Sequence, residues 1–552
     1  MFRLQGIDFF QHVVASRNCV LPRCNRQQFQ GYAAPTLSWN FCLLYVGAAI
    51  FGFASNCLAQ TSSNRSQLMR LISAGGRGGA LLSTLGVFGA AFFWLLGFKV
   101  VAHWMGPEGV GLFSQLRQMA QAATVGATFG GTNSIVQGLA EREAESARRQ
   151  FRATAARIVA LAGAGVVLAI LGLAPQLSAF FLSSDAPVLV ATLRWLALAV
   201  LLNVGATYSL GVLNGYRSYP YLALAQISGP VVLVMLLAGA WWWTLPPDPQ
   251  LLAGSFVLCF GVTCLLGARG LSRLPPFVAV LGASGLTKSQ SRVFLKFALS
   301  NLVAALSTTL ALLLIRSWVI ESRGLAFAGL FDSGWTLTFN YTTLFLTACS
   351  AIYLPLLTAA TRPEEQKVCM LKTAYLVFGA GILICYAMVL FRQPLINLLY
   401  SPQFQASGEV LMVLVIAVLF RGASWVYGTM ILATRNSRVL LLSDLALNLC
   451  LLATARYALE RHTSLQALSW AFVLPNFLYL VFVVEYARKK NPLMQRRLIW
   501  PLLVAGTLPL FYLALAPGGL EWTYSRLAVW LCMAIGLAVS VAALIAYKKV
   551  AL

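Results

Sequence analysis

Uninterrupted apolar stretches of about 20 residues recur along the whole 552-residue chain, and this pattern restricts the fold more strongly than any other sequence feature. Each stretch is long enough to cross the roughly 30 Å hydrocarbon layer of a membrane as a helix. Strands of a membrane barrel would alternate polar and apolar residues, whereas these stretches are continuously apolar. Only 10% of the residues are charged, against about one quarter in soluble domains. The sequence therefore predicts an all-α polytopic membrane protein.

The apolar stretches predict about fourteen transmembrane helices, arranged as two six-helix lobes followed by a C-terminal helix pair. The expected spans are 79–102, 110–139, 156–182, 188–214, 220–243, 250–268, 297–319, 327–358, 373–391, 408–433, 439–457, 465–486, 499–516 and 526–547. The expected segments are an atypical N-terminal extension (1–68), a first lobe (70–270), a basic cytoplasmic linker (271–296), a second lobe (297–487) and the final pair (498–548). Two interpretations of the extension stay open: a signal-like or extra membrane segment at 41–58, or a translation start at Met69.

The net charge of +24 would suggest a nucleic-acid partner if the protein were soluble. Here the lysines and arginines lie mostly in short loops between spans, where they mark the cytoplasmic side of a membrane. The loops expected on the other side carry only Arg323, Arg392, Arg456, Arg461 and Arg526. This asymmetry predicts that both ends of the core lie in the cytoplasm, and it argues against nucleic-acid binding. The eleven cysteines and three histidines show no zinc-ligand spacing, so no metal site is predicted.

The two predicted lobes repeat each other at an offset of about 218–219 residues, which indicates an internal duplication. Gly111-Leu112-Phe113 recurs as Gly329-Leu330-Phe331. A polar stripe at helical spacing recurs as well, made of Ser114, Arg117, Gln121, Thr124 and Thr128 in one lobe and Ser333, Thr336, Asn340, Thr343 and Thr347 in the other. Helix packing in lipid is one explanation of such a stripe. The matched arrangement favours a polar cavity shared by two lobes that a pseudo-twofold axis along the membrane normal relates.

Several ionisable side chains fall inside the predicted spans, where an unpartnered charge costs roughly 2.5–3.5 kcal/mol. They are Lys99, Arg117, Arg194, Arg316 and Arg421, with Asp332 and Asp444 as the acids. Because cations outnumber carboxylates, the cavity suits an anionic group, above all a phosphate or pyrophosphate. The alternative for Lys99, Arg194 and Arg316 is that they reach the membrane interface. Asp332 and Asp444 are candidates for carrying a coupling proton or sodium ion, or for pairing with an arginine.

These observations predict a candidate substrate site and no catalytic one. The expected site residues are Lys99, Arg117, Gln121, Thr124, Arg194, Arg316, Asn340, Thr343 and Arg421. No cofactor is expected beyond a proton or sodium gradient, and no nucleotide-binding loop or catalytic constellation is evident. The sequence predicts a transporter rather than an enzyme, and no segment indicates an oligomer.

The turn after the first span carries a family resemblance, Trp104-Met105-Gly106-Pro107-Glu108-Gly109-Val110-Gly111 followed by Phe113-Ser114-Gln115-Leu116-Arg117-Gln118. It resembles the first periplasmic turn of the polysaccharide-type (O-antigen or lipid-linked oligosaccharide) flippases in the multidrug/oligosaccharidyl-lipid/polysaccharide exporter superfamily. Leu213-Asn214-Gly215-Tyr216-Arg217 is similar to the turn between the fourth and fifth helices of that family. The resemblance covers about 70–487, although the N-terminal extension is atypical.

The resemblance implies a pair of helix bundles in a bacterial inner membrane that opens alternately to each side. The implied cargo is an undecaprenyl-pyrophosphate-linked oligosaccharide for cell-surface polysaccharide or lipopolysaccharide synthesis, with glycan polymerase machinery as a candidate partner. Three alternatives stay open: a peptidoglycan lipid-precursor flippase, which the two extra spans support, a cation-coupled multidrug exporter, and a membrane glycosyltransferase or polymerase. The excess of cavity cations argues against the exporter, and the short outer loops argue against the enzyme.

Overall fold

The structure is a computed structural model that describes residues 77–551, apart from 141, 143, 275–287, 361, 435, 492, 494–499 and 516–524. Within these residues the chain is helical and contains no strand. Ten of the described helices are long and apolar enough to cross a membrane, and Trp500–Leu515 is a shorter apolar helix. The prediction of an all-α polytopic membrane protein is therefore confirmed. The predicted extension, 1–68, lies outside the described residues.

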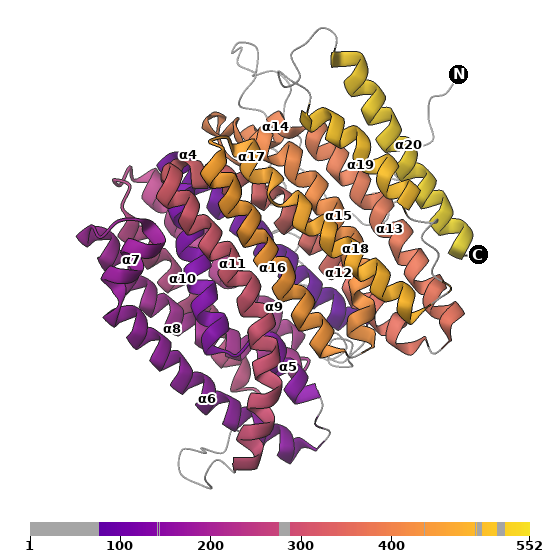
Figure 1. Cartoon of the computed structure of the whole chain (residues 1–552). Helices are drawn as coiled ribbons and strands as arrows, with labels where there is room; N and C mark the ends of the chain where they lie inside the picture. Colours follow the sequence, from indigo (N-terminus) through magenta and orange to yellow (C-terminus); the bar gives the residue numbers. More distant parts are fainter. Residues whose placement is uncertain are drawn as a thin grey trace, which may run out of the picture. The chain divides into compact units, whose positions relative to one another are not determined.

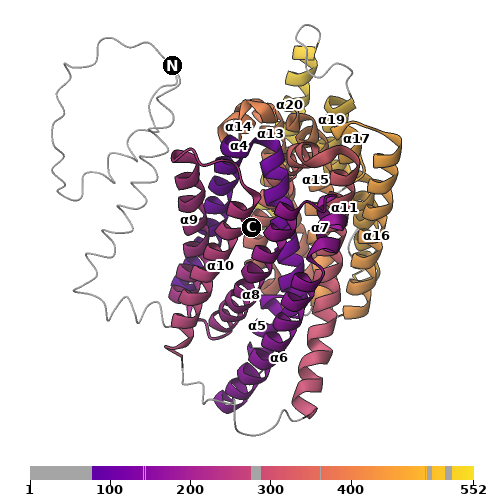
Figure 2. The same cartoon turned by 90° about the vertical axis from the view of Figure 1, so that its left-hand side faces the viewer.

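The helices of the first lobe pack around α4. They are α4 (Arg77–Ala127), α5 (Thr132–Ala140), α6 (Glu145–Gly172), α7 (Ala174–Leu182), α8 (Pro187–Gly215), α9 (Tyr219–Trp242) and α10 (Pro249–Leu271). α4 contacts α8 and α9, α10 contacts both of those helices, and α6 packs on α8 (Figure 2). Prolines occupy the first turns of α8, α9 and α10, where a missing N–H leaves no intrahelical bond unmade.

The second lobe is built around α15, which is buried along most of its length. Its elements are α11 (Lys288–Trp335), the π-helix η1 (Thr336–Asn340), α12 (Tyr341–Ala359), α13 (Pro363–Leu390), α14 (Arg392–Leu399), the 3₁₀ turn η2 (Pro402–Phe404), α15 (Ser407–Ala433), α16 (Ser437–Arg461), α17 (Leu465–Trp470) and α18 (Val473–Lys490). α11 begins inside the predicted linker, 271–296, so the last part of that linker is helical. Residues 275–287 lie outside the described residues.

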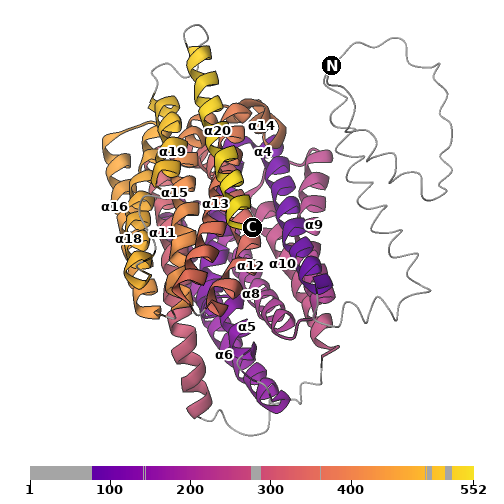
Figure 3. The same cartoon turned by 90° about the vertical axis from the view of Figure 1, so that its right-hand side faces the viewer.

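The final helix pair packs on the second lobe. α20 (Ser525–Ala551) lies against α13, and α19 (Trp500–Leu515) contacts α15 and α20 (Figure 3). Gly379 of α13 and Gly506 of α19 sit at close contacts, because a Cβ on either would come within 3 Å of a neighbouring side chain. Missing side chains thus let these helices approach closely, as small residues do in membrane bundles.

Two glycines at equivalent positions of the repeat break α4 and α11. Gly106 has φ 65° and Gly324 has φ 84°, values that glycine adopts without the strain of a side chain. We call the end of the molecule with these two breaks the turn end. The basic end is the one that carries Arg142, Arg217 and Arg273. In Figure 1, α14 and α17 lie at the turn end, and α5 lies at the basic end.

At the turn end the two lobes meet backbone to backbone. A Cβ on Gly111 of α4 would collide with the carbonyl oxygen of Leu325, and a Cβ on Gly329 of α11 would collide with that of Pro107. Gly111 and Gly329 are the residues that the internal repeat matches, so the contact lies where two related helices face each other. Because neither residue has a side chain, the lobes close tightly at this end.

Enlarging either glycine should open the turn end. Gly329→Val forces a side chain into the carbonyl of Pro107, and overpacking of this kind costs about 1–3 kcal/mol. A cost of that size shifts the balance between closed and open forms by about ten-fold. The shift can be measured as faster thiol labelling of a cysteine placed at the buried Ser114.

Gly126→Val is the matched control, because a Cβ on this glycine of α4 meets nothing within 4 Å. Equal labelling rates in Gly329→Val and Gly126→Val would show that the glycine contact does not hold the turn end closed.

Candidate functional site

A buried ion pair lies where the lobes meet, close to the Gly111–Gly329 contact. Arg316 Nε donates to Asp332 Oδ1 at 2.6 Å, and the two residues are only 5% and 1% exposed. They sit on opposite sides of the Gly324 break, one on each arm of α11. The fold therefore places Asp332, which is buried where the lobes meet, beside an arginine of the same helix.

Gln118 of the first lobe joins this pair. Its Oε1 accepts a 2.9 Å bond from Arg316 Nη1, and its Nε2 donates a 3.2 Å bond to the carbonyl oxygen of Thr309. Arg316 and Thr309 both belong to α11, while Gln118 belongs to α4. The side chain of Gln118, 6% exposed, thus ties one lobe to the other by two hydrogen bonds.

Arg117, next to Gln118 in the chain, lies against aromatic rings. Its guanidinium carbon lies 4.8 Å from the ring centre of Phe98 and 5.5 Å from that of Trp94. Cation–π contacts of this kind stabilise a cation without neutralising it. Arg117 Nε is buried and makes no hydrogen bond, and none of the ion pairs in the described residues includes Arg117. Within the described residues the site therefore holds one arginine that is ion-paired with a carboxylate, Arg316, and one that forms no ion pair, Arg117.

The second lobe contributes two tyrosines to the surroundings of Arg117. Tyr341, at the start of α12, and Tyr400, at the end of α14, lie close to Arg117, as do the charged Arg316 and Asp332. The hydroxyl of Tyr400 is buried. Groups from both lobes therefore converge on this arginine.

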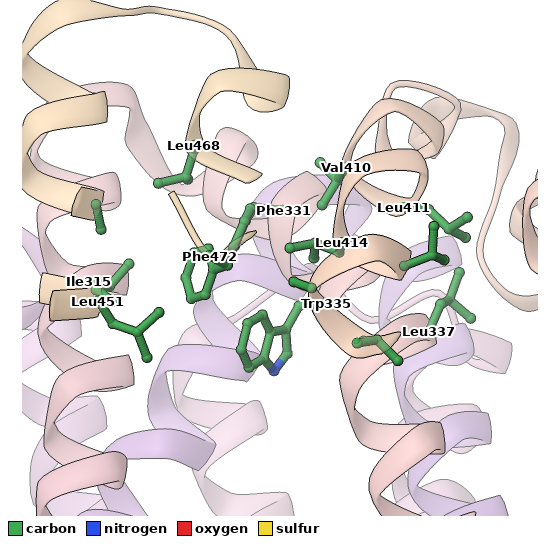
Figure 4. Packing of buried hydrophobic residues seen from close by; sticks show 14 of the residues in the cluster. Ile315, Phe331, Trp335, Leu337, Val410, Leu411, Leu414, Leu451, Leu468 and Phe472 are labelled. Carbon is green, nitrogen blue, oxygen red and sulfur yellow. The ribbon is translucent and has the colours of Figure 1, made fainter. Parts of the chain in front are cut away.

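Aromatic packing fixes the arm of α11 that carries Asp332. The ring of Phe331 lies 5.6 Å from that of Phe472, and the ring of Trp335 lies 5.0 Å from it. Figure 4 shows these three rings together, with Val410 and Leu414 of α15 beside them. Because such large side chains are held on several sides, Asp332 has a fixed position from which to orient Arg316.

The repeated polar stripe divides along its length. Toward the turn end Ser114, Ser333 and Thr336 are buried, whereas toward the basic end Gln121 and Thr343 are exposed. The stripe is thus enclosed where the lobes meet. Beyond Gln118, Gln121, Thr343 and Thr347 are exposed, whereas Thr124 and Thr128 of the first lobe are buried.

Thr124 and Asn340 are held by neighbours in their own lobes. Thr124 accepts a 2.9 Å bond from Asn203 of α8, and Asn340 donates a 3.5 Å bond to Thr336. Asn340 also ends the π-helix η1, which interrupts the second stripe. Single π-turns within helices are often found at functional sites. The sequence pattern did not predict this π-turn.

Two of the predicted cations lie away from Arg117. Lys99 is partly exposed on α4 and acts electrostatically on His103, and it is absent from the electrostatic neighbours of Arg117. Arg194 is exposed on α8, beside the exposed Trp195. The predicted set of cavity cations is therefore spread over separate places in the structure.

Arg421 and Asp444 form a second polar group inside the second lobe. Tyr479 of α18 donates a 3.2 Å hydrogen bond to Asp444 Oδ1 of α16. The guanidinium carbon of Arg421 of α15 lies 5.7 Å from the ring centre of Tyr479. Arg421 also interacts electrostatically with Asp444, so three helices of this lobe converge on one carboxylate.

Sequence reasoning missed the role of Gln118 and of the rings around Arg117. Gln118 lies outside the polar stripe, since it is one residue beyond Arg117, and its partners come from residues 309 and 316 of another helix. The signal that the sequence did contain is the spacing of Ser114 and Gln118, which are four residues apart and share a helix face. Nothing in the sequence linked Tyr341 or Tyr400 to Arg117.

The arrangement suits the capture of an anion. A guanidinium that no carboxylate neutralises, set against aromatic rings, can donate charge-assisted hydrogen bonds to phosphate oxygens. The exposed part of the polar stripe offers amide and hydroxyl groups to a polar ligand. Among the described residues, no group of histidine, cysteine, aspartate and glutamate is arranged to hold a metal ion.

Comparison with known proteins agrees with this architecture. Residues 77–268 match the family model described as polysaccharide biosynthesis protein. No curated protein matches the chain in sequence. The structure is similar to the inward-closed lipid II flippase MurJ, with a TM-score of 0.63 and 11% identity over 86% of this chain and 100% of that one.

Multidrug transporters of the MATE family are similar as well. An inward-facing structure of a MATE family transporter gives a TM-score of 0.62 at 16% identity, over 75% of this chain and 95% of that one. An outward-facing structure gives 0.56 at 17% identity, over 75% of this chain and 94% of that one. The chain is thus a polytopic membrane protein with the fold of the MOP superfamily. Within that class the first lobe matches the polysaccharide biosynthesis proteins, so the resemblance seen in the sequence is confirmed over residues 77–268.

Proposed function

We propose that this protein translocates an undecaprenyl-pyrophosphate-linked oligosaccharide from the cytoplasmic to the periplasmic leaflet of a bacterial inner membrane. The cargo would serve the synthesis of cell-surface polysaccharide such as O-antigen, with the basic end and both core termini in the cytoplasm. The glycan polymerase machinery that uses the translocated lipid is the proposed partner.

The observation that carries this proposal is the environment of Arg117. A half-buried cation set against Trp94, Phe98 and the tyrosines of the second lobe costs free energy unless a ligand or a partner compensates it. No carboxylate in the described residues pairs with it. A pyrophosphate that enters between the lobes would supply the missing negative charge, while the exposed Gln121 and Thr343 would face the sugars.

The proposed transport cycle is alternating access. The lobes are closed at the turn end by the Gly111–Gly329 contact, and Gln121, Thr343 and Thr347 of the polar stripe are exposed on the side of the basic end. If the basic end faces the cytoplasm, this is the form that receives cargo from the cytoplasmic leaflet.

A proton or sodium gradient is the proposed driving force, with Asp444 and Asp332 as candidate carriers. Asp444 is bound by Tyr479 and lies near Arg421, within one lobe. Asp332 is paired with Arg316, so its ionisation is tied to the lobe contact. No further cofactor is proposed.

A second candidate function is translocation of a peptidoglycan lipid precursor. The similarity to the lipid II flippase extends over that whole chain, and α19 and α20 provide the additional helix pair. Both candidate cargoes carry a polyprenyl pyrophosphate, so the same arginine would serve either. They differ in the sugars that the polar stripe meets.

Depletion of the protein tests the proposal. We expect lipid-linked glycans to accumulate on the cytoplasmic face, because an anionic sugar headgroup does not cross the hydrocarbon layer unaided. The measurement is labelling of the glycolipids with a probe that cannot cross the membrane, before and after re-expression. The sugars of the accumulated lipid distinguish the two candidate cargoes.

Normal arrival of every glycolipid at the outer face would overturn both flippase functions. If sensitivity to toxic cations rose at the same time, the drug-exporter alternative would replace them.

A further inference from the structure

The two central arginines are not equally available to a ligand. Arg316 is engaged through two of its nitrogens, Nε with Asp332 and Nη1 with Gln118. Arg117 has a free Nε and no carboxylate partner. A pyrophosphate that arrives between the lobes in this form therefore meets one free guanidinium and one that is occupied.

The occupying group comes from the opposite lobe. Gln118 holds two points on one face of α11, since Thr309 and Arg316 are separated by two helical turns. The hydrogen bonds to the guanidinium and to the carbonyl use both ends of the amide group. Any movement that separates α4 from α11 at this level must break both bonds.

Gln118 also lies directly behind the closed turn end. It is two helical turns from Gly111 along α4, and Gly111 packs against the same helix, α11. Ser114, between them, is 1% exposed. The glycine contact and the Gln118 bonds therefore belong to one contact surface, and opening of the turn end would release them together.

We propose that Gln118 is a positioning residue that keeps Nη1 of Arg316 occupied, and so unavailable to the ligand, while the turn end is closed. The two arginines then bind the pyrophosphate one after the other. The inference rests on the proposed function. Arg117 binds the anion first. When α4 and α11 separate, Nη1 of Arg316 loses Gln118 and becomes a donor toward a phosphate oxygen, while Nε stays on Asp332. The substrate then compensates the bonds that opening breaks, which links its presence to the opening of the turn end.

The first test measures opening. A cysteine replaces Ser114 in a variant whose native cysteines have been removed, and the purified full-length protein is labelled with a water-soluble thiol reagent. Gln118→Leu should speed labelling by about ten-fold, because a hydrogen bond to a charged group contributes about 1.5–3 kcal/mol. Gln118→Glu should slow labelling, because the ion pair of its carboxylate with Arg316 across the lobes outweighs the lost hydrogen bond to the carbonyl oxygen of Thr309.

The opposite signs separate positioning from a merely structural role, which would make both variants label faster. Gln115→Leu is the matched control. Gln115 is also a buried glutamine of α4, but its amide donates to the carbonyl oxygen of Phe181 within its own lobe. Labelling that rises equally in Gln118→Leu and Gln118→Glu would overturn the proposal.

The second test measures affinity for inorganic pyrophosphate by titration calorimetry on the same proteins. Gln118→Leu frees Nη1 and should bind pyrophosphate about three-fold or more tightly than the wild type, and Gln118→Glu should bind it more weakly. Gln115→Leu should match the wild type. If the labelling rates change as expected but the affinities do not, Gln118 joins the lobes without controlling Arg316, and the proposal fails while the proposed function stands. If the wild type binds no pyrophosphate, the proposed function fails, and the positioning role of Gln118 fails with it.

Discussion

Arg117→Gln is expected to abolish glycolipid translocation while leaving the protein folded in the membrane. The arginine forms no ion pair in the described residues, so glutamine removes the charge without breaking an ion pair. One charge-assisted hydrogen bond to a phosphate contributes about 1.5–3 kcal/mol, so the affinity for pyrophosphate should fall at least about ten-fold. The measurement is leaflet-resolved labelling of the lipid-linked glycan in cells that express the variant.

The control for Arg117→Gln is the same substitution at an arginine outside the site. Arg456 is an exposed arginine of α16 paired with Glu460, and exposed pairs of this kind contribute little. Arg456→Gln should therefore export normally at an equal level of membrane-inserted protein. Normal export by alanine variants of both Arg117 and Arg316 would end the idea of a pyrophosphate clamp.

Asp332→Ala is expected to destabilise the protein more than any other single change in the lobe contact. The substitution leaves Arg316 buried, 5% exposed, with its charge uncompensated. Breaking a buried ion pair by removing one partner costs about 3–5 kcal/mol. The measurement is the melting temperature of the purified protein in detergent, with unfolding monitored by circular dichroism.

The double variant Asp332→Ala/Arg316→Met shows whether the loss comes from the orphaned charge. Replacing both members of a buried pair by apolar groups is often close to neutral, so the double variant should melt near the wild-type temperature. It should still fail to transport, because it lacks the second arginine. A double variant as unstable as Asp332→Ala would show that packing, and not the charge, accounts for the loss.

Much of the fold could be predicted because its determinants are local. A continuous apolar stretch must form its own hydrogen bonds in lipid, so each one specifies a helix wherever it lies in the chain. The repeat was also readable, and the breaks at Gly106 and Gly324 occur at matching positions of it. Glycine was needed at each because the backbone there has a positive φ.

The candidate site was less predictable, because it depends on which side chains meet across the lobes. The sequence indicated that Arg117, Arg316 and Asp332 lie inside the membrane, but not that Asp332 neutralises Arg316 and leaves Arg117 free. Lys99 and Arg316 hold equivalent places in the repeat, yet Lys99 is partly exposed near His103 whereas Arg316 is buried. The sequence did not distinguish Gln118 from other polar residues of a helix, because its partners lie on another helix, α11.

By itself, the sequence determined the all-α membrane class, the duplicated pattern and the excess of cations within the spans, since hydrophobicity and helical spacing are properties of neighbouring residues. Only the tertiary structure decided that the lobes close at Gly111 and Gly329, that one arginine is paired and the other is not, and that Gln118 connects the two. Those facts depend on contacts between residues almost 200 positions apart, such as Gln118 and Arg316, and local patterns carry no information about such pairs. The physical reason is that a buried charge selects its partner through three-dimensional proximity, which only the packing of the helices establishes.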